Sequence, residues 1–319
     1  MTLPALLNNL KFMKILSPVT KTDHVVKVND YSVESIVSLY KKDFSLDVSD
    51  YFKGLDSISV YQCLDTGYRF FYPLNLSGDE FFYQHLQKYD WYYSNWKWEY
   101  DDALSILEPE KKLLEVGCGD GYFLLKARDR GVVAEGIELN NSAVKACRAK
   151  GLQLHNESVI DYAVSHNSAY DYVFSFQVVE HIAEVGLFIK AMVDLLKPGG
   201  RLLISVPNND SALFKESGLV ALNMPPHHMG LWDLNSLVAL ADHYPITLEK
   251  IWLEGLDSRH AGIAETLAEK MLALKLAERS KIFGPILHKL VARFARFGGR
   301  SVSKYILGHT ITVVYRKYE

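Results

Sequence analysis

The sequence predicts an α/β protein in which a parallel sheet follows a smaller helical and hairpin subdomain. From Leu113 onward, short apolar strands, glycine-rich turns and helices follow one another repeatedly. This alternation is typical of a parallel sheet with helices on both faces. Because ligands of such sheets bind at the carboxyl ends of the strands, we expect the functional residues in the loops that follow them.

Seven segments after Leu113 have the apolar character of strands, and helices fit between the first five. They are KLLEVG, VAEGIEL, LQLHN, YDYVFSF, RLLISVP, ITLEKIWLE and HTITVVYRK. Before Leu113, Ser32 is placed to cap a helix that runs to about Phe44. SISVYQC and YRFFYP alternate around the turn LDTG and predict a hairpin. A second helix is expected to start at Ser77, with Glu80 completing a capping box.

Composition excludes several classes of protein. The 319 residues carry a net charge of −3, which gives no electrostatic case for nucleic acid. No apolar run approaches the roughly 20 residues that span a bilayer, and the N-terminus lacks a small-residue cleavage site, so we expect a soluble, cytoplasmic protein. Cys63, Cys118 and Cys147 are too widely spaced for a disulfide framework or a tetrahedral zinc site.

The loop after the first strand, EVGCGDGYF, has the strongest chemical signal in the chain. Gly117, Gly119 and Gly121 alternate after Glu115. A dinucleotide-binding loop requires Gly-x-Gly-x-x-Gly, and the ring of Tyr122 at the third glycine position would obstruct packing of helix on strand. The pattern therefore disfavours NAD. An acidic residue beside alternate glycines favours a ligand with hydroxyl or ammonium groups over one with phosphates.

A second acidic residue supports a nucleoside ligand. Glu138 ends the second strand in GIELN, 17 residues after Gly121. Its carboxylate is placed to accept hydrogen bonds from the two hydroxyls of a ribose.

Four motifs, LLEVGCGDG, GIELN, YDYVFSFQVVEHI and LLKPGGRLLISVPN, are similar in order and spacing to those of class I S-adenosylmethionine-dependent methyltransferases. The resemblance covers roughly residues 111–255 and 309–317. It implies a Rossmann-like sheet of seven strands, the last antiparallel, and S-adenosylmethionine as cofactor. Residues 111–319 are then the cofactor-binding domain, and residues 1–110 form a cap over the active site.

The resemblance also implies roles for individual residues. The loop from Glu115 to Gly121 would hold the methionine portion, and Glu138 the ribose. Residues after the third strand would edge the adenine, and the backbone after the fourth strand would meet the amino-acid end. The expected cofactor-binding residues are Glu115, Gly117, Cys118, Gly119, Gly121, Glu138, Leu139, Ser158, Val159, Phe176 and Gln177.

Methyl transfer from a sulfonium requires the protein to align the acceptor, exclude water and, for a hydroxyl acceptor, remove a proton. NMPPHHMGLWD follows the fifth strand, and its prolines predict an extended segment before His227 and His228. Histidine titrates near neutrality, so either ring is a candidate general base, although a structural role is equally compatible. His181, after the fourth strand, is a third candidate, with Glu180 as its orienting neighbour.

The segment WYYSNWKWEY, residues 91–100, holds three of the five tryptophans. In the methyltransferases that the chain resembles, this region folds over cofactor and acceptor, so we expect an aromatic roof that excludes water and lies near the sulfonium. The residues expected to contact the acceptor are Tyr92, Tyr93, Trp96 and Lys97, the last through a carboxylate. Packing in the core of the N-terminal subdomain is the alternative for Trp91, Trp98 and Tyr100. Acidic neighbours, Glu99 among them, disfavour a nucleic-acid platform.

Two further segments depart from the family pattern. YQCLDTGYRFFYP is similar to the end of a small zinc module found before some related domains, but only Cys63 remains, so we expect no zinc and no metal ligands among the site residues. Residues 258–308 form an insert before the last strand that is too long for a bare loop. It carries two predicted helices, and residues 281–297 present an apolar stripe opposite basic residues. The insert could shape the acceptor pocket, contact a second subunit, lie on an anionic membrane surface or pack on its own domain.

The function that follows is methyl transfer from S-adenosylmethionine to a small-molecule or glycan acceptor, with oxygen as the expected atom. Transfer to carbon or nitrogen is the alternative among enzymes. A non-catalytic cofactor-binding regulatory subunit is the alternative from another class. An NAD-dependent reductase ranks third because of Tyr122.

Overall fold

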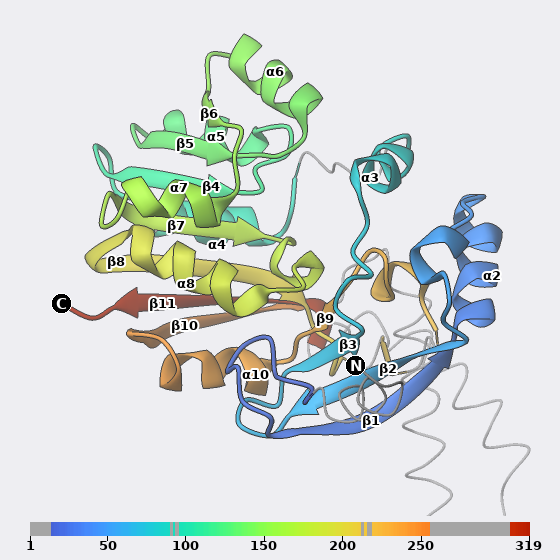
Figure 1. Ribbon diagram of the computed structural model, residues 1–319. Helices are drawn as coiled ribbons and strands as arrows, with labels where there is room; N and C mark the ends of the chain where they lie inside the picture. The colour runs from blue at the N-terminus through green and yellow to red at the C-terminus, as the bar shows by residue number, and fades with distance from the viewer. Residues whose placement is uncertain (1–13, 90–91, 93–95, 212–213, 216–218, 256–306) are drawn as a thin grey trace, which may run out of the picture.

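The computed structural model describes residues 14–255 and 307–319, apart from 90–91, 93–95, 212–213 and 216–218. Within this part of the chain two sheets meet, one of seven strands and one of four (Figure 1). The helices expected within the insert, and the stripe at 281–297, lie outside the described residues. Leu307 and Gly308, which we assigned to the insert, instead begin the last strand.

The larger sheet has the strand order β10-β11-β8-β7-β4-β5-β6. Neighbouring strands from β8 to β6 pair in parallel, whereas β11 runs antiparallel to both β8 and β10. All seven predicted strands and the antiparallel direction of the last are therefore confirmed. Their bounds are β4 Lys112–Val116, β5 Val133–Ile137, β6 Gln153–His155, β7 Tyr170–Phe176, β8 Leu196–Pro207, β10 Ile246–Gly255 and β11 Leu307–Lys317.

Successive residues of the central strands enter two separate cores, because side chains alternate across a sheet. Leu113 of β4 packs with one set of helices and Leu114 with the other. The first set comprises α4 (Glu99–Ser105), α5 (Tyr122–Arg128) and α6 (Asn141–Ala149). The second comprises α7 (Val159–Ser165), α8 (Val185–Leu195) and α10 (Leu234–Val238). Both faces of the sheet are therefore covered.

The smaller sheet has the order β1-β2-β3-β9 and is antiparallel throughout. The predicted hairpin is confirmed as its central pair. A third core fills the space between this sheet and the N-terminal helices. The elements are β1 (Val25–Ser32), β2 (Ser57–Cys63), β3 (Arg69–Tyr72), β9 (Gly230–Leu231), α2 (Val33–Phe44) and α3 (Glu80–Leu86). Four 3-10 turns complete the described chain: η2 (Ser49–Phe52), η3 (Val179–His181), η4 (Ala221–Asn223) and η5 (Ala239–Asp242).

The two predicted helix caps of this region differ in outcome. Ser32 caps α2 as expected, since its hydroxyl accepts from the backbone N–H of Ser35 at 3.4 Å. The cap expected at Ser77 was wrong. Asp79 caps α3 instead, because its carboxylate accepts from the N–H of Phe82 at 3.0 Å. A carboxylate at this position also interacts favourably with the helix dipole.

The segment before β1 docks on α8 through a close backbone approach at Gly186. A Cβ added there would lie 2.4 Å from the carbonyl oxygen of Pro18 and 2.9 Å from that of Val19. We therefore expect Gly186→Ala to lower the free energy of unfolding by about 1–3 kcal/mol, outweighing the roughly 1 kcal/mol that alanine contributes within a helix. Urea unfolding measures this difference. Leu187→Ala is the control, since that side chain is 48% exposed, and a neutral Gly186→Ala would argue against the docking.

Candidate active site

The loop between β4 and α5 adopts a backbone that requires glycine. Gly117, Gly119 and Gly121 have φ values of 76°, 53° and 75°, which lie in the left-handed region. A Cβ at Gly117 would approach Val178 to 2.4 Å, and one at Gly121 would approach Leu152 to 2.5 Å. The loop is thus closely packed between the segment after β7 and Leu152, which lies between α6 and β6.

Glu138 holds this loop while keeping part of its hydrogen-bonding capacity. Its two carboxylate oxygens accept from the backbone N–H groups of Gly119 at 2.9 Å and Asn140 at 2.8 Å. A carboxylate accepts about four hydrogen bonds, so positions remain for other donors. The next residue, Leu139, leaves its side chain 65% exposed.

Glu115 lies below the same loop in a different environment. Its side chain is 2% exposed, and its Oε2 atom has no hydrogen-bond partner. Burial raises the pKa of Glu115 well above its usual value, and the nearby charge of Lys97 opposes this shift. An unpartnered buried carboxylate is costly, and its cost would fall if a cation bound beside it.

Lys97 comes from the predicted roof and reaches the carboxyl end of β7. Its Nζ donates to the backbone oxygen of Phe176 at 3.4 Å and lies 5.8 Å from the ring of Tyr100. The adjacent Gln177 has a φ of 57°, a strained conformation that often marks functional positions. Its N–H donates to the carbonyl oxygen of Ser205 at 2.8 Å.

Some expected cofactor residues turn their side chains away from the loop surface. Val159 is 2% exposed and belongs to the core. Cys118 is 6% exposed and packs with Cys147. The hydroxyl of Ser158 accepts from the N–H of Asp161 at 3.1 Å and caps α7. These three positions can offer a ligand mainly their backbone.

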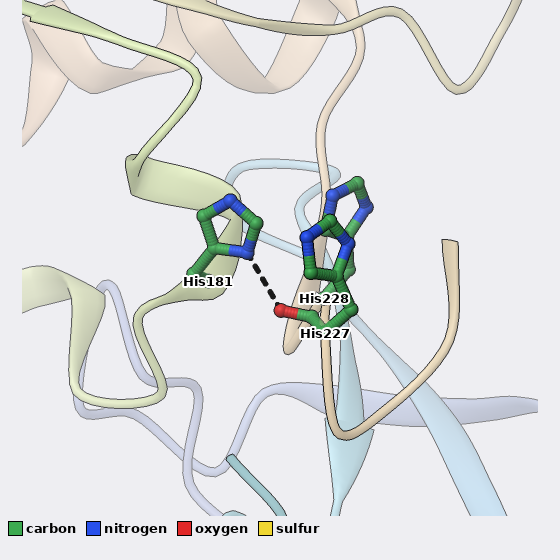
Figure 2. Close-up of side chains that lie close together, drawn as sticks. All are labelled: His181, His227 and His228. Carbon is green, nitrogen blue, oxygen red and sulfur yellow. Dashed lines mark hydrogen bonds between the residues drawn. The ribbon is translucent and has the colours of Figure 1, made fainter. Parts of the chain in front are cut away.

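The three histidines selected from the sequence lie together (Figure 2). The rings of His227 and His228 stack with centroids 4.6 Å apart, and the ring of His181 meets them at centroid distances of 4.5 and 4.9 Å. His181 closes η3 after β7, whereas the other two precede β9. Val178 packs on Gly117, and its carbonyl oxygen accepts from the N–H of His181 at 2.9 Å, so the segment that carries His181 links the cluster to the glycine loop.

Burial keeps all three rings neutral. It lowers the pKa of His181 to about 4 and holds the pKa values of His227 and His228 well below the usual value for histidine. The Nδ1 of His181 faces the backbone oxygen of His227 at 2.7 Å. The Nδ1 atoms of His227 and His228 face the backbone oxygen of Leu222 at 2.8 Å and the Oδ1 of Asn223 at 3.1 Å. Since oxygen accepts in each case, Nδ1 carries the proton and Nε2 carries the lone pair.

Two expectations about this cluster were wrong. The prolines do not hold an extended segment, because the N–H groups of His227 and His228 both donate to the carbonyl oxygen of Met224 and close a turn. Glu180 does not orient His181 through a hydrogen bond, since its Oε1 lies 3.9 Å from Nε2. Backbone oxygen performs that function, and burial raises the pKa of Glu180 to about 8.

The aromatic segment contacts both the histidine cluster and the end of β7. The hydroxyl of Tyr92 lies 3.4 Å from the Nε2 of His227, and Lys97 meets the end of β7 as described. Trp96 is 46% exposed, and Tyr100 is buried in the core beside α5. Tyr93, like Trp91, lies outside the described residues.

Two residues of the site were not anticipated. Glu99 was noted only as an acidic neighbour of the aromatic segment, but it is 2% exposed and accepts from the hydroxyl of Ser205 at 3.1 Å. Asn223 orients His228, and its own amide is oriented by Asn209 at 2.8 Å. Asn223 stands five residues before His228, which is only a weak sequence signal for their contact. Nothing in the local sequence indicates that Glu99 is buried.

Comparison with known proteins agrees with this geometry. Residues 91–250, about half of the chain, match the model of a methyltransferase domain family. Ubiquinone biosynthesis O-methyltransferases from Saccharophagus degradans and Thiobacillus denitrificans are 29% and 31% identical over 107 residues, which are 32% of this chain and 45% and 46% of those proteins. The chain thus spans about half the length of the curated relatives it matches.

A solved structure of an S-adenosylmethionine-dependent methyltransferase from Archaeoglobus fulgidus shares the fold. Its TM-score is 0.51 at 18% identity, and the likeness covers 75% of this chain and 100% of that one. The sheet order, with its antiparallel last strand, is that implied by the sequence motifs. The chain belongs to the class I S-adenosylmethionine-dependent methyltransferases.

Proposed function

We propose that this protein transfers a methyl group from S-adenosylmethionine to a hydroxyl oxygen of a small-molecule or sugar-type acceptor. The observation that carries the proposal is the cluster of three imidazoles whose Nδ1 atoms each face an oxygen acceptor, so that each Nε2 keeps a lone pair. A neutral imidazole can take the proton that a hydroxyl loses on methylation. The names of the curated relatives, which describe O-methyltransferases, support transfer to oxygen.

The residues around the glycine loop fit the cofactor. The unpartnered oxygen of Glu115 suits the ammonium of the methionine portion, and the remaining acceptor positions of Glu138 suit ribose hydroxyls. Lys97, beside the end of β7, suits the carboxylate of the same portion. S-adenosylmethionine, when bound, supplies an electrophilic methyl group.

The acceptor side of the site is formed by aromatic rings around the histidines. The rings of Tyr83 and Phe82 lie 6.2 and 6.0 Å from that of His227, and the ring of Tyr92 lies 6.0 Å from it. These rings exclude water and provide an apolar wall for the acceptor. Within the described residues, no helix has the length and apolar character needed to cross a bilayer.

Cofactor binding can be tested with a ligand pair that differs only in the amino-acid portion. Lys97→Met should weaken S-adenosylhomocysteine about 10- to 100-fold, the loss of a charge-assisted contact of about 1.5–3 kcal/mol. It should leave 5′-methylthioadenosine, which lacks that portion, nearly unaffected. Glu138→Ala should weaken both ligands, because both contain the ribose. Isothermal titration measures each affinity, and the exposed Glu157→Gln is the control. Equal losses for both ligands in Lys97→Met would contradict the assignment.

Glu115 should couple the stability of the protein to pH. Its pKa is raised by burial, so the folded state binds more protons than the unfolded state as pH rises above about 4.5, and this group costs stability in that direction. Glu115→Gln does not titrate. Its melting temperature relative to the natural protein should therefore rise between pH 5 and pH 8, while its affinity for S-adenosylhomocysteine falls. A melting difference that is independent of pH would show that Glu115 is ionised throughout.

Transfer to oxygen can be tested with cofactor labelled with ¹³C at the methyl group and a panel of phenols and sugars. The carbon chemical shift of the product identifies the atom methylated, and a product on nitrogen or carbon would contradict the proposal. In the double variant His227→Ala/His228→Ala, turnover should fall by about 100- to 10,000-fold with little change in cofactor affinity. The exposed His243→Ala is the control. Loss of cofactor affinity together with turnover would show that the turn is structural.

A further inference from the structure

The histidine cluster has a property that proton transfer alone does not require. One ring nitrogen from each of His181, His227 and His228 lies within 4.8 Å of the other two. Among the residues that the structure describes, no other group of three potential ligand side chains is this close. The three rings come from two separate segments, so their convergence is a product of the fold.

The hydrogen bonds around the cluster prepare all three rings in the same way. Each Nδ1 donates to a carbonyl oxygen, from the backbone of His227, the backbone of Leu222 or the side chain of Asn223. Metal-binding histidines have this arrangement, in which an outer oxygen fixes the tautomer and leaves the other nitrogen as the ligand. A base would need only one such ring, whereas here three are fixed.

A buried carboxyl group lies beside the three rings. Glu180 is 1% exposed, its Oε1 is 3.9 Å from the Nε2 of His181, and its Oε2 has no hydrogen-bond partner. A cation in the cluster would offset the cost of burying this group. The side chain of His181 remains 16% exposed, which gives an ion a route of entry.

We propose that His181, His227 and His228 bind one Zn²⁺ ion through their Nε2 atoms and leave one coordination position open. Imidazole nitrogen suits Zn²⁺ and its neighbours in the first transition row, whereas Mg²⁺ prefers oxygen. Zinc–nitrogen bonds of about 2.0–2.1 Å place the ligand atoms roughly 3.3 Å apart, which shifts of about 1 Å in these side chains would achieve. Three protein ligands with an open fourth position form the catalytic type of zinc site.

The proposed zinc site would act on the acceptor and not on the cofactor. An ion at this position would bind the acceptor hydroxyl and lower its pKa, as zinc does for bound water, so that its proton would pass to bulk water as the oxygen attacks the methyl group. In the metal-loaded protein the imidazoles therefore hold the ion, whereas in the metal-free protein one of them has to accept the proton. The metal site itself does not depend on the proposed methyl transfer and can be tested without an acceptor.

The first experiment measures metal binding by the full-length protein. Protein treated with a chelator is dialysed against micromolar Zn²⁺ or Co²⁺, and metal content is measured by mass spectrometry. We expect about one ion per chain, a visible Co²⁺ spectrum typical of four coordination, and no competition from millimolar Mg²⁺. X-ray absorption of the Zn²⁺ form should count three imidazoles. Absence of stoichiometric metal, or a spectrum without imidazole ligands, would overturn the proposal.

Variants then assign the ligands. His181→Ala and His228→Ala should each weaken Zn²⁺ binding at least 100-fold, and Asn223→Ala should weaken it about 10- to 100-fold through the outer hydrogen bond. His243→Ala, at an exposed position, should have no effect. Retained binding of S-adenosylhomocysteine shows that a variant is folded. If His228→Ala does not fold, His228→Gln is tested in its place. Unchanged Zn²⁺ affinity in folded variants of the cluster would assign the metal to other residues and overturn the proposal.

Discussion

The pairing of β3 with β9 is the constraint on which the rest of the site depends. Only two residue pairs form it, Arg69 with Leu231 and Phe70 with Gly230. They nevertheless attach the loop after the fifth strand to the N-terminal sheet, and the packing around them tolerates no change of register. A Cβ at Gly230 would lie 1.9 Å from the hydroxyl of Tyr68, whose ring packs on the buried Trp232 with centroids 4.2 Å apart. The histidine turn is held immediately before this contact, so the two sheets together determine where its rings lie.

Three buried acidic residues dominate the electrostatics around Lys97. Glu99, Glu115 and Glu180 are each almost fully buried, and burial raises the pKa of all three while the charge of Lys97 opposes the shift. Within the described residues, the charge of Lys97 thus acts on all three buried acids at once. Such an arrangement is expensive in the absence of ligand and is relieved when positive charge enters. In the proposed function, a sulfonium cofactor with an ammonium group would bring that charge, and we therefore expect ligand binding and stability to be coupled through desolvation as well as through shape.

Local sequence patterns predicted the seven strands and the central hairpin because apolar periodicity and glycine are local signals, and the resemblance to the family predicted the antiparallel direction of the last strand. Other features depend on contacts with distant segments. β1 was missed because Lys27, Asn29 and Asp30 break its pattern, and at the edge of the sheet it remains largely exposed. β9 is two residues long and exists only because β3 lies beside it. The histidines could be selected from their place after the strands, but their tautomers follow from oxygen atoms that only the folded turn brings to them.

The two halves of the site therefore differ in how they are specified, and this difference bears on the acceptor. The proposed cofactor half consists of one glycine loop and the ends of neighbouring strands, all within the residues that match the methyltransferase family. The acceptor half also requires segments outside that match. The hydroxyl of Tyr40 on α2 donates to the carbonyl oxygen of Met224 at 2.9 Å and supports the histidine turn, and β3 fixes its far end. If the proposed function is right, changes in α2 or β3 would reshape the acceptor side of the site without altering the glycine loop. Membership of the family then determines the cofactor, whereas the acceptor depends on the N-terminal sheet.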